Sequence, residues 1–299
     1  MNNLITTIMF CVALSLPLIV NAEKIDKTLD VSANGRINIE IMAGEIVVEG
    51  WDKPQVRVVG DLPANGHNFT FETNGSVTEI EHQGEHGFWG SNRGPGGHAN
   101  ITVYAPRDSR FSVDSTSAEY SLKNINGQVR ASTMSGDIYL EGGVGNVTAE
   151  SVSGNVKVTG SKGRLYLGSV SGNINADGNA EEFDAQTISG NIHARVGTSS
   201  RITLESISGD IDLKARLGDN ARLDAGTVSG DIEIVFDSED INASFDIETG
   251  PGGEVRNRIS DHKPENERFL FSGTMRFKLG DGDSSVNLET MSGTIKMDH

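Results

Sequence analysis

The chain has 299 residues and a formal net charge of −17, with 36 glycines and only seven prolines. This acidity disfavours nucleic acids and anionic lipid head groups as partners, and it permits cations and cationic or neutral polymers. The glycines lie among frequent β-branched residues, so they indicate tight turns between strands rather than disorder.

Residues 1–22 have the features of a secretory signal peptide. An apolar run from Ile8 to Val20 ends at the small-residue site Val20-Asn21-Ala22, after which we expect cleavage. The run is short for the alternative, a membrane anchor, and we expect no integral membrane segment after cleavage. The only cysteine, Cys11, lies inside this segment, so the mature chain forms no disulfide. We therefore expect an exported protein, either periplasmic or at the cell surface.

Residues 23–106 are expected to form an N-terminal β region. Apolar and polar residues alternate from Ile37 to Ile41, which is typical of a strand, and Met42-Ala43-Gly44-Glu45-Ile46 then resembles a turn that recurs later in the chain. After this early coil, further alternating segments lie at 55–59, 68–73, 77–81 and 101–106. Residues 83–99 are rich in Gly, His and Asn, which predicts a long loop.

Residues 107–299 are expected to form a repeat region, because the phrase Ser-Gly-Asp/Asn occurs there six times. Each copy follows an apolar residue and precedes Ile or Val, and successive serines are 18, 18, 18, 19 and 21 residues apart. A period of this length is typical of a solenoid, in which each repeat forms one coil. The predicted turn ladder is Ser135, Gly136, Asp137, Ser153, Gly154, Asn155, Ser171, Gly172, Asn173, Ser189, Gly190, Asn191, Ser208, Gly209, Asp210, Ser229, Gly230 and Asp231.

Each coil is predicted to hold two short strands joined at the phrase. Relative to the phrase serine, position −2 always bears a hydroxyl, and apolar residues lie at −6, −4, −1, +3 and +5. We interpret all of these apolar positions as inward, with the inward parity switching beside the serine, for example between Ser206 and Ile207. The left-handed hexapeptide helix does not fit, since it needs an apolar residue every six positions.

Stacking would pair each strand with its equivalents about 4.8 Å away, so the strands are expected to be parallel. The crossover rule favours a right-handed coil. We therefore predict an all-β fold, a single-domain right-handed β-solenoid with coils of 18–21 residues.

The phrase itself is interpreted as a corner. Its glycine accommodates a positive φ or a close neighbouring backbone, and its Asp or Asn can bond its own turn. The alternative is a row of calcium sites. Three consecutive members, Asn155, Asn173 and Asn191, are neutral, which favours a structural turn over a cation ladder.

The strand-like segment Ile101–Pro106, followed by serial Ser-Gly-Asp/Asn-Ile/Val turns, resembles the bacterial putative-adhesin domain of unknown function, also called the toast-rack family. The resemblance covers most of residues 30–299 and is strongest over 100–234. It implies an exported or envelope-associated β-solenoid whose relatives are associated with cell-envelope stress systems. It supplies no catalytic residues.

The loop at 83–99 holds the other candidate site residues. His82, His86 and His98 have the ligand chemistry for a transition metal, against the alternative of solvated loop histidines. Phe88 and Trp89 could stack on a sugar ring or fold down as a lid on the first coils.

We expect a non-enzymatic, exported module that needs no cofactor and acts in adhesin-like or envelope-polymer binding, or as a scaffold. Its partner would be an envelope glycan or an envelope protein. The first alternative is a protein-interaction component of cell-envelope stress sensing that acts through an open solenoid end near Met297. The second is a polysaccharide-active enzyme, which would need acidic and basic residues together on one face. The sequence does not indicate an oligomeric state.

Overall fold

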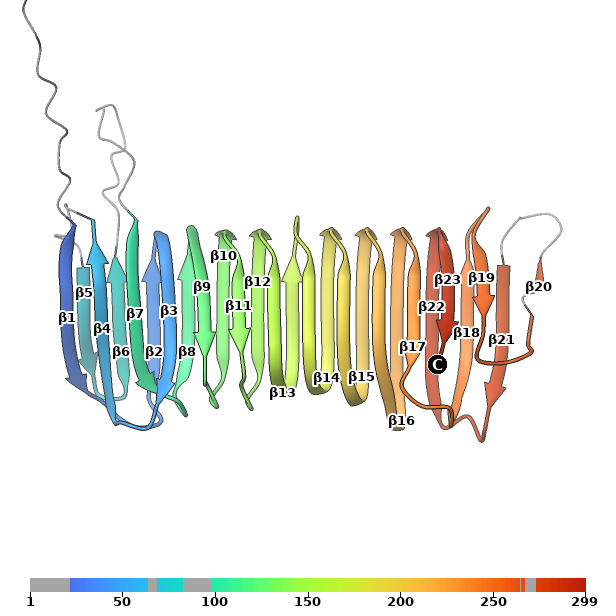
Figure 1. Ribbon diagram of the computed structural model, residues 1–299, viewed down its shortest axis with the longest axis horizontal. Helices are drawn as coiled ribbons and strands as arrows, with labels where there is room; N and C mark the ends of the chain where they lie inside the picture. The colour runs from blue at the N-terminus through green and yellow to red at the C-terminus, as the bar shows by residue number, and fades with distance from the viewer. Residues whose placement is uncertain (1–21, 64–68, 83–97, 264, 267–272) are drawn as a thin grey trace, which may run out of the picture.

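A computed structural model describes residues 22–63, 69–82, 98–263, 265–266 and 273–299, and within these ranges it contains strands and turns but no helix. All 23 strands belong to one sheet with both parallel and antiparallel pairs (Figure 1). The prediction of an all-β fold is therefore confirmed.

The strands of the N-terminal third are β1 (Glu23–Asp30), β2 (Arg36–Ile41), β3 (Ala43–Trp51), β4 (Gln55–Leu62), β5 (Phe69–Asn74), β6 (Val77–His82), β7 (Ala99–Pro106), β8 (Arg110–Ser115) and β9 (Ser117–Lys123). The repeat strands are β10 (Val129–Ser135), β11 (Ile138–Glu141), β12 (Val147–Ser153), β13 (Val156–Ser169), β14 (Ile174–Ser189), β15 (Ile192–Ser208), β16 (Ile211–Ser229) and β17 (Ile232–Phe236). The C-terminal strands are β18 (Ala243–Thr249), β19 (Glu254–Asn257), β20 (Glu265–Asn266), β21 (Gly273–Leu279), β22 (Ser284–Ser292) and β23 (Thr294–Asp298).

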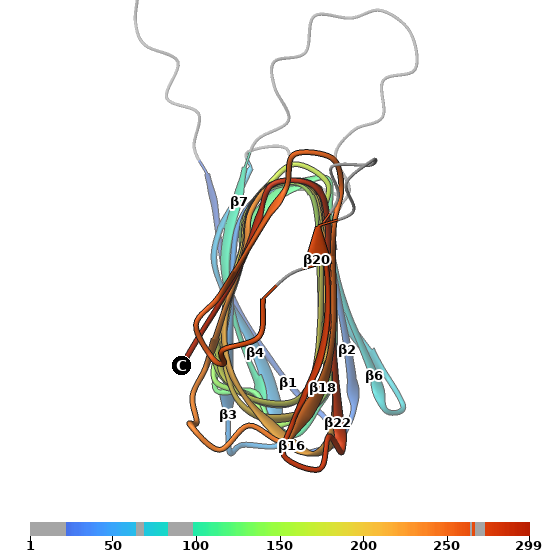
Figure 2. The same ribbon diagram turned by 90° about the vertical axis from the view of Figure 1, so that its right-hand side faces the viewer.

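The sheet wraps into a flattened tube, which Figure 2 shows from one end. One broad wall, here called the front wall, runs β5–β6–β2–β8–β10–β12, then the C-terminal halves of β13 to β16, then β22–β18–β21–β20. The opposite rear wall runs β1–β4–β7–β3–β9–β11, then the N-terminal halves of β13 to β16, then β17–β23–β19. The phrase turns join the two walls along one narrow edge of the tube.

Apolar side chains fill the tube because each strand alternates an inward apolar residue with an outward polar one. In the coil of Ser171, the inward residues are Leu165 and Leu167 before the corner and Ile174 and Ala176 after it, and all are buried. Consecutive coils place like residues in register, as in the pairs Val129–Val147, Val147–Leu165 and Leu165–Phe183. The predicted positions −6, −4, +3 and +5 therefore build the core.

The hydroxyl at position −2 ties each corner to the coil before it. Ser151, for example, is buried, and its Oγ donates a hydrogen bond to the carbonyl of Gly136 at 3.0 Å. The same bond recurs in the following coils, from Ser169, Thr187, Ser206, Thr227 and Thr290 to the phrase glycine of the preceding coil. Each bond satisfies a carbonyl that the bend would otherwise leave without a partner.

Glycine is needed in the phrase because neighbouring backbones approach closely there. A Cβ added to Gly172 would lie 2.1 Å from the carbonyl oxygen of Gly154, and Gly154, Gly190 and Gly209 meet the same obstacle at about the same distance. The close approach of neighbouring backbones therefore explains the glycines along the ladder. Gly136 also has a positive φ, of 155°, which side chains other than glycine rarely adopt.

The Asp or Asn of the phrase bonds the next coil rather than its own turn. Oδ1 of Asp137 accepts the backbone N–H of Asn155 at 2.7 Å, and Asn155 accepts from Asn173 in the same way at 3.0 Å. Asn173, Asn191, Asp210 and Asp231 continue the series into the final coil. The expectation of a bond within one turn was wrong, because stacking brings the next amide within reach of each side chain.

The expectation of parallel strands throughout was also wrong, because antiparallel pairs close both ends of the stack. Strand β4 is antiparallel to β1 and β7, and β5 is antiparallel to β6. At the other end, β21 is antiparallel to β18 and β20. Hairpins at the ends limit the number of free parallel strand edges, which would otherwise template association with other chains.

The last coil does not lie at an end of the stack. Strand β22 pairs with β16 on one side and β18 on the other, and β23 lies between β17 and β19. Met297 is fully buried there. Met297 itself is therefore not at an open end. The rear wall ends one strand beyond it, at β19, because β18, β19 and β21 lie beyond the last coil and the final residues fill the space left behind.

Candidate functional site

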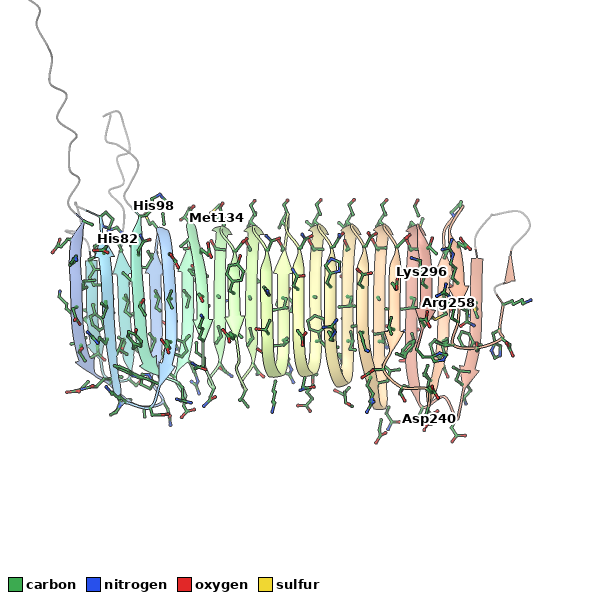
Figure 3. The ribbon with its side chains drawn as sticks, in the orientation of Figure 1. His82, His98, Met134, Asp240, Arg258 and Lys296 are labelled. Atoms are coloured by element: carbon green, nitrogen blue, oxygen red, sulfur yellow. The ribbon has the colours of Figure 1, made fainter. Side chains whose placement is uncertain are left out.

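A row of exposed apolar side chains follows the phrase edge of the tube. We define the apolar row as the residues at position −1 of seven coils, whose exposed fractions run from 40% at Val170 to 61% at Met134: Met134, Val152, Val170, Ile188, Ile207, Val228 and Met291. Figure 3 shows side chains projecting from this edge, with Met134 labelled. At about 4.8 Å per coil, seven residues extend over about 29 Å.

The sequence interpretation of this position as inward was wrong. In the repeat strands, positions −1 and 0 are both exposed, so two outward residues follow the buried hydroxyl before the inward pattern resumes at +3. The parity switch thus falls between −1 and the serine instead of between −2 and −1. Simple alternation continued from −6, −4 and −2 would have placed the −1 residues outside, so this signal was present in the sequence.

A groove runs beside the apolar row on the front wall. It has a volume of about 860 Å³, and its lining extends from Ser115 across the coils to Met291. Two of its residues at position −3, Gly168 and Gly226, leave the wall hollow there. A Cβ added at either glycine meets nothing closer than 3.5 Å, so neither glycine is required by the backbone.

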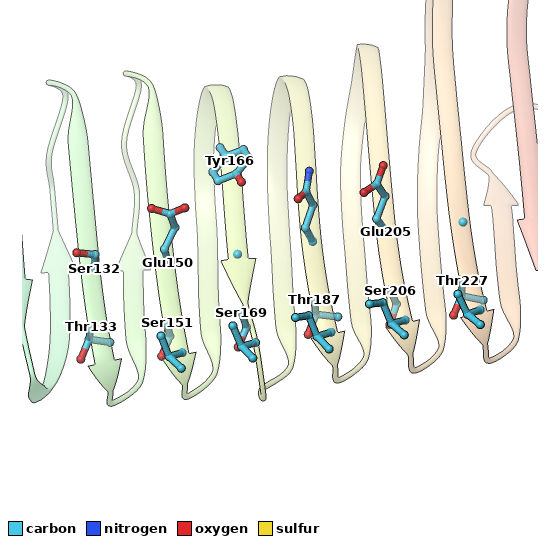
Figure 4. A pocket seen from close by; sticks show the side chains of 18 of the residues that line it. Ser132, Thr133, Glu150, Ser151, Tyr166, Ser169, Thr187, Glu205, Ser206 and Thr227 are labelled. Carbon is cyan, nitrogen blue, oxygen red and sulfur yellow. The ribbon is translucent and has the colours of Figure 1, made fainter.

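Carboxylates give the groove its charge. Its lining includes Glu150, Glu205 and Glu289, all at position −3, and no Lys, Arg or His. Figure 4 shows Glu150, Tyr166 and Glu205 projecting from neighbouring strands. Among the described residues, Glu150 forms an ion pair with Arg130 at 3.6 Å, whereas Glu205 and Glu289 form none.

Two titratable groups in or beside the groove have raised pKa values. Burial raises the pKa of the Tyr166 hydroxyl, and the negative charges of Glu150, Asp184 and Glu205 raise it further. Burial also raises the pKa of Asp184, against a hydrogen bond from Gln186 that lowers it. A positively charged group placed in the groove would offset this accumulated negative charge.

The rear wall carries charge pairs that join neighbouring coils. His193 lies 2.7 Å from Asp212, Arg195 lies 3.3 Å from Asp177, and Lys296 lies 3.4 Å from Glu233. A hollow of about 770 Å³ on this wall is lined by residues of both charges. Ion pairs also occur on the front wall, from Arg164 to Glu182 and from Arg276 to Asp246, but these residues do not line the groove.

Two of the candidate loop residues lie in the described part of the chain. His82 is buried at the end of β6, where burial lowers its pKa, and His98 is exposed just before β7. His86, Phe88 and Trp89 lie outside the described residues, so the metal site and the sugar-stacking pair remain predictions. Within the described ranges, no three His, Cys, Asp or Glu side chains come together as a metal site.

The signal segment, residues 1–22, also lies almost wholly outside the described part of the chain. No helix in the described ranges has the length and hydrophobicity to span a membrane.

Comparison with known proteins finds a family and several solved structures. The family model described as Toastrack DUF4097 matches residues 34–298. No curated protein matches the chain.

Three solved structures are similar over most of their length. A "putative adhesin" from Bacteroides fragilis has 16% identity and a TM-score of 0.40, with 92% of this chain and 97% of that chain covered. A "putative lipid binding protein" from Parabacteroides distasonis has 13% identity and a TM-score of 0.39, with coverage of 94% and 98%. A "putative cell adhesion protein" from Clostridium sporogenes has 13% identity and a TM-score of 0.23, with coverage of 93% and 99%.

Proposed function

The chain belongs to the Toastrack family, and we propose that it is an exported, non-enzymatic binding module of the cell envelope, periplasmic or at the cell surface. In this proposal a right-handed β-solenoid acts as a straight scaffold, and its front wall holds an extended polymer of the envelope. The observation that carries the proposal is the apolar row, which continues through seven coils beside the groove.

Single exposed apolar residues are ordinary on a protein surface, but a contiguous apolar patch usually marks an interaction site. In the apolar row, equivalent side chains occupy the same position of successive coils, about 4.8 Å apart, and all seven line the same groove. Serine or threonine would satisfy the outward geometry of position −1 equally well, as Thr116 does in the coil before Met134. The retention of apolar residues in seven coils therefore favours a contact surface.

An elongated ligand fits the shape of this site better than a compact one. The groove crosses the strands and follows the long axis of the tube, from the coil of Ser115 to the coil of Met291. A polymer chain can contact several coils at once, so many weak contacts add along its length. A small metabolite would contact only one or two coils.

The non-enzymatic part of the proposal is supported by the chemistry of the lining. Along the wall the three lining carboxylates are about 14 Å and about 10 Å apart, farther than the roughly 5–9.5 Å between the paired carboxyl groups of glycosidases. Arg222, on a neighbouring strand position, is engaged by both carboxylate oxygens of Asp224. An activity screen on acidic and neutral glycans tests this part separately.

The binding proposal is tested with the double variant Ile188→Ser/Ile207→Ser and envelope extract separated into glycan and protein fractions. Both residues are exposed, so the fold should be preserved while binding to one fraction weakens by about 30-fold, given about 1 kcal/mol for each of the two lost contacts. Val144→Ser is the matched control, because Val144 is 60% exposed in the turn between β11 and β12 and lies outside the row. Equal binding by the double variant and the wild type would remove the front wall from consideration.

A further inference from the structure

We propose that the groove of the front wall binds an extended polypeptide segment in which lysine or arginine side chains alternate with apolar ones. This inference rests on the proposed function, since it names the partner class for the same site. Three features support it: the unpaired charge of the groove, the spacing of its carboxylates, and the hydrogen bonds that its hydroxyl groups already donate to the backbone.

The charge of the groove selects for a cation. Among the described residues, Glu205 and Glu289 lack an ion-pair partner, and Glu150 retains exposed surface beside its pair with Arg130. After burial, the charges of Glu150, Asp184 and Glu205 contribute to the raised pKa of Tyr166. A second copy of this chain would bring the same carboxylates and the same net negative charge, so like-charge repulsion disfavours self-association through this wall.

The spacing of the carboxylates suits an extended polypeptide. Glu150 lies on β12 and Glu205 on β15, three coils apart, and Glu289 lies on β22, two coils further along the wall. At about 4.8 Å per coil, these separations are about 14 Å and about 10 Å. An extended chain rises about 3.3 Å per residue and presents every second side chain to the same face. Lysines at every fourth position would therefore lie on one face, about 13 Å apart, and come within the reach of a lysine side chain of all three carboxylates.

Apolar side chains of the same segment have places between the carboxylates. The hollows at Gly168 and Gly226 alternate with the glutamates along position −3. The apolar row forms one rim of these hollows, with Val170 and Val228 in the same two coils. A segment of mixed apolar and basic residues would thus bury apolar surface in the hollows while its charges reach the carboxylates.

The hydroxyl groups of the lining argue against a glycan in the groove. Those of Ser151, Ser169, Thr187, Ser206 and Thr227 donate to backbone carbonyls of the preceding coil. They are therefore committed as donors, and the aromatic platforms that sugars use are limited to Tyr166 among the lining residues. The side chains of lysine and arginine are donors only, so carboxylate acceptors match them.

The test uses synthetic peptides and the full mature chain. The probe has lysines at its first, fifth and ninth positions with valine and threonine between them, and matched peptides carry glutamine or glutamate in place of lysine. Binding is measured by fluorescence anisotropy at low and at high salt. We expect the lysine peptide to bind, the other two to bind at least about tenfold more weakly, and the lysine peptide to lose affinity as salt rises.

The double variant Glu205→Gln/Glu289→Gln should weaken binding of the lysine peptide by about tenfold. Glu181→Gln is the matched control, because Glu181 is an exposed glutamate on β14 outside the groove, and it should bind like the wild type. Gly226→Tyr provides a second variant, since it fills a hollow without a backbone clash and should also weaken binding.

Equal binding of the lysine and glutamine peptides would overturn the inference. So would self-association on sedimentation that the double variant Ile188→Ser/Ile207→Ser abolishes, because the occupant would then be a second copy. If no peptide binds but that double variant still loses binding to an envelope glycan fraction, this inference fails and the proposed function stands. If the chain binds neither the lysine peptide nor any envelope fraction, both this inference and the proposed function are wrong.

Discussion

The backbone amide of Asn155 donates to the side chain of Asp137, 18 residues earlier, at 2.7 Å. This bond joins two coils at their corners, and it repeats to the last coil, where Thr294 donates to Asp231. Each Asp or Asn of the phrase is therefore a staple between coils, in addition to the pairing of the strands.

Replacing Asn173 tests the contribution of one staple. Asn173→Ala leaves the amide of Asn191 without its acceptor, and because the site is exposed, water partly replaces it. We expect a loss of about 1 kcal/mol in the free energy of unfolding, measured by urea denaturation. Asn173→Asp keeps the acceptor oxygen and should lose less. An alanine variant as stable as the wild type would show that the staple contributes nothing net.

Replacing a phrase glycine tests the close approach of the backbones. In Gly172→Ala the new Cβ would lie 2.1 Å from the oxygen of Gly154, so the two coils must separate locally. We expect a loss of about 3 kcal/mol or more in the free energy of unfolding. Gly168→Ala, three residues before the phrase serine of the same coil, meets no backbone and should be neutral or mildly stabilising. Similar stabilities for the two variants would contradict the close approach.

The buried hydroxyls have a separate energetic role. Thr187→Val keeps the shape of the side chain but removes the hydroxyl that donates to the carbonyl of Gly172. In the wild type, Oγ1 of Thr187 lies 3.2 Å from that carbonyl oxygen. We expect destabilisation of about 1–2 kcal/mol, because a buried carbonyl loses its partner. Thr187→Ser retains the hydroxyl and serves as the control in the same thermal and urea measurements. The interpretation fails if valine is tolerated better than serine.

The burial of His82 predicts a pH dependence of stability. Burial lowers the pKa of His82 in the folded state, so the unfolded chain takes up a proton more readily as the pH falls. The wild type should therefore lose stability relative to His82→Leu as the pH drops from about 7.5 to about 5.5, below the ordinary histidine pKa of about 6.5. His98→Gln, at an exposed position, should follow the wild type. Parallel pH profiles for the wild type and His82→Leu would exclude this role.

The position of the last coil predicts a strong effect of truncation. A chain that ends at Asp283 lacks β22 and β23, so β16 and β18 lose their shared neighbour and the groove loses Glu289 and Met291. We expect loss of the cooperative thermal transition or a drop of many degrees in its midpoint. A chain that lacks only His299 should melt like the wild type. Because the core of the last coil includes Val286, Leu288, Ile295 and Met297, a small effect of the long truncation would contradict the pairing described here.

The sequence was sufficient to predict the repeat, its register and most of its core, because stacking forces equivalent residues such as Leu165 and Phe183 into contact. It was insufficient at Ile207, where an apolar side chain at a corner was taken as buried although it lies outside. The acidic groove was also missed, because position −3 varies from Gly168 to Glu205 and shows no motif along the chain. Only the stack brings its three glutamates onto one wall. The placement of the last coil depends on pairing between distant segments, which local patterns do not encode.

The insertion of β22 and β23 has a consequence for the order of folding. Neighbouring repeat coils form contacts between residues 18 apart, such as Asp137 and Asn155, whereas the last coil joins Asp231 to Thr294, 63 residues apart. Long-range closure is entropically costly and slow. In a chain that folds while it is synthesised from the N-terminus, most repeat coils would stack early. The position between β16 and β18 would stay empty, with unpaired strand edges on both sides, until β22 and β23 are made. The sheet can therefore close only after β22 and β23 have been made. A chain without these two strands exposes unpaired strand edges that can pair with other chains.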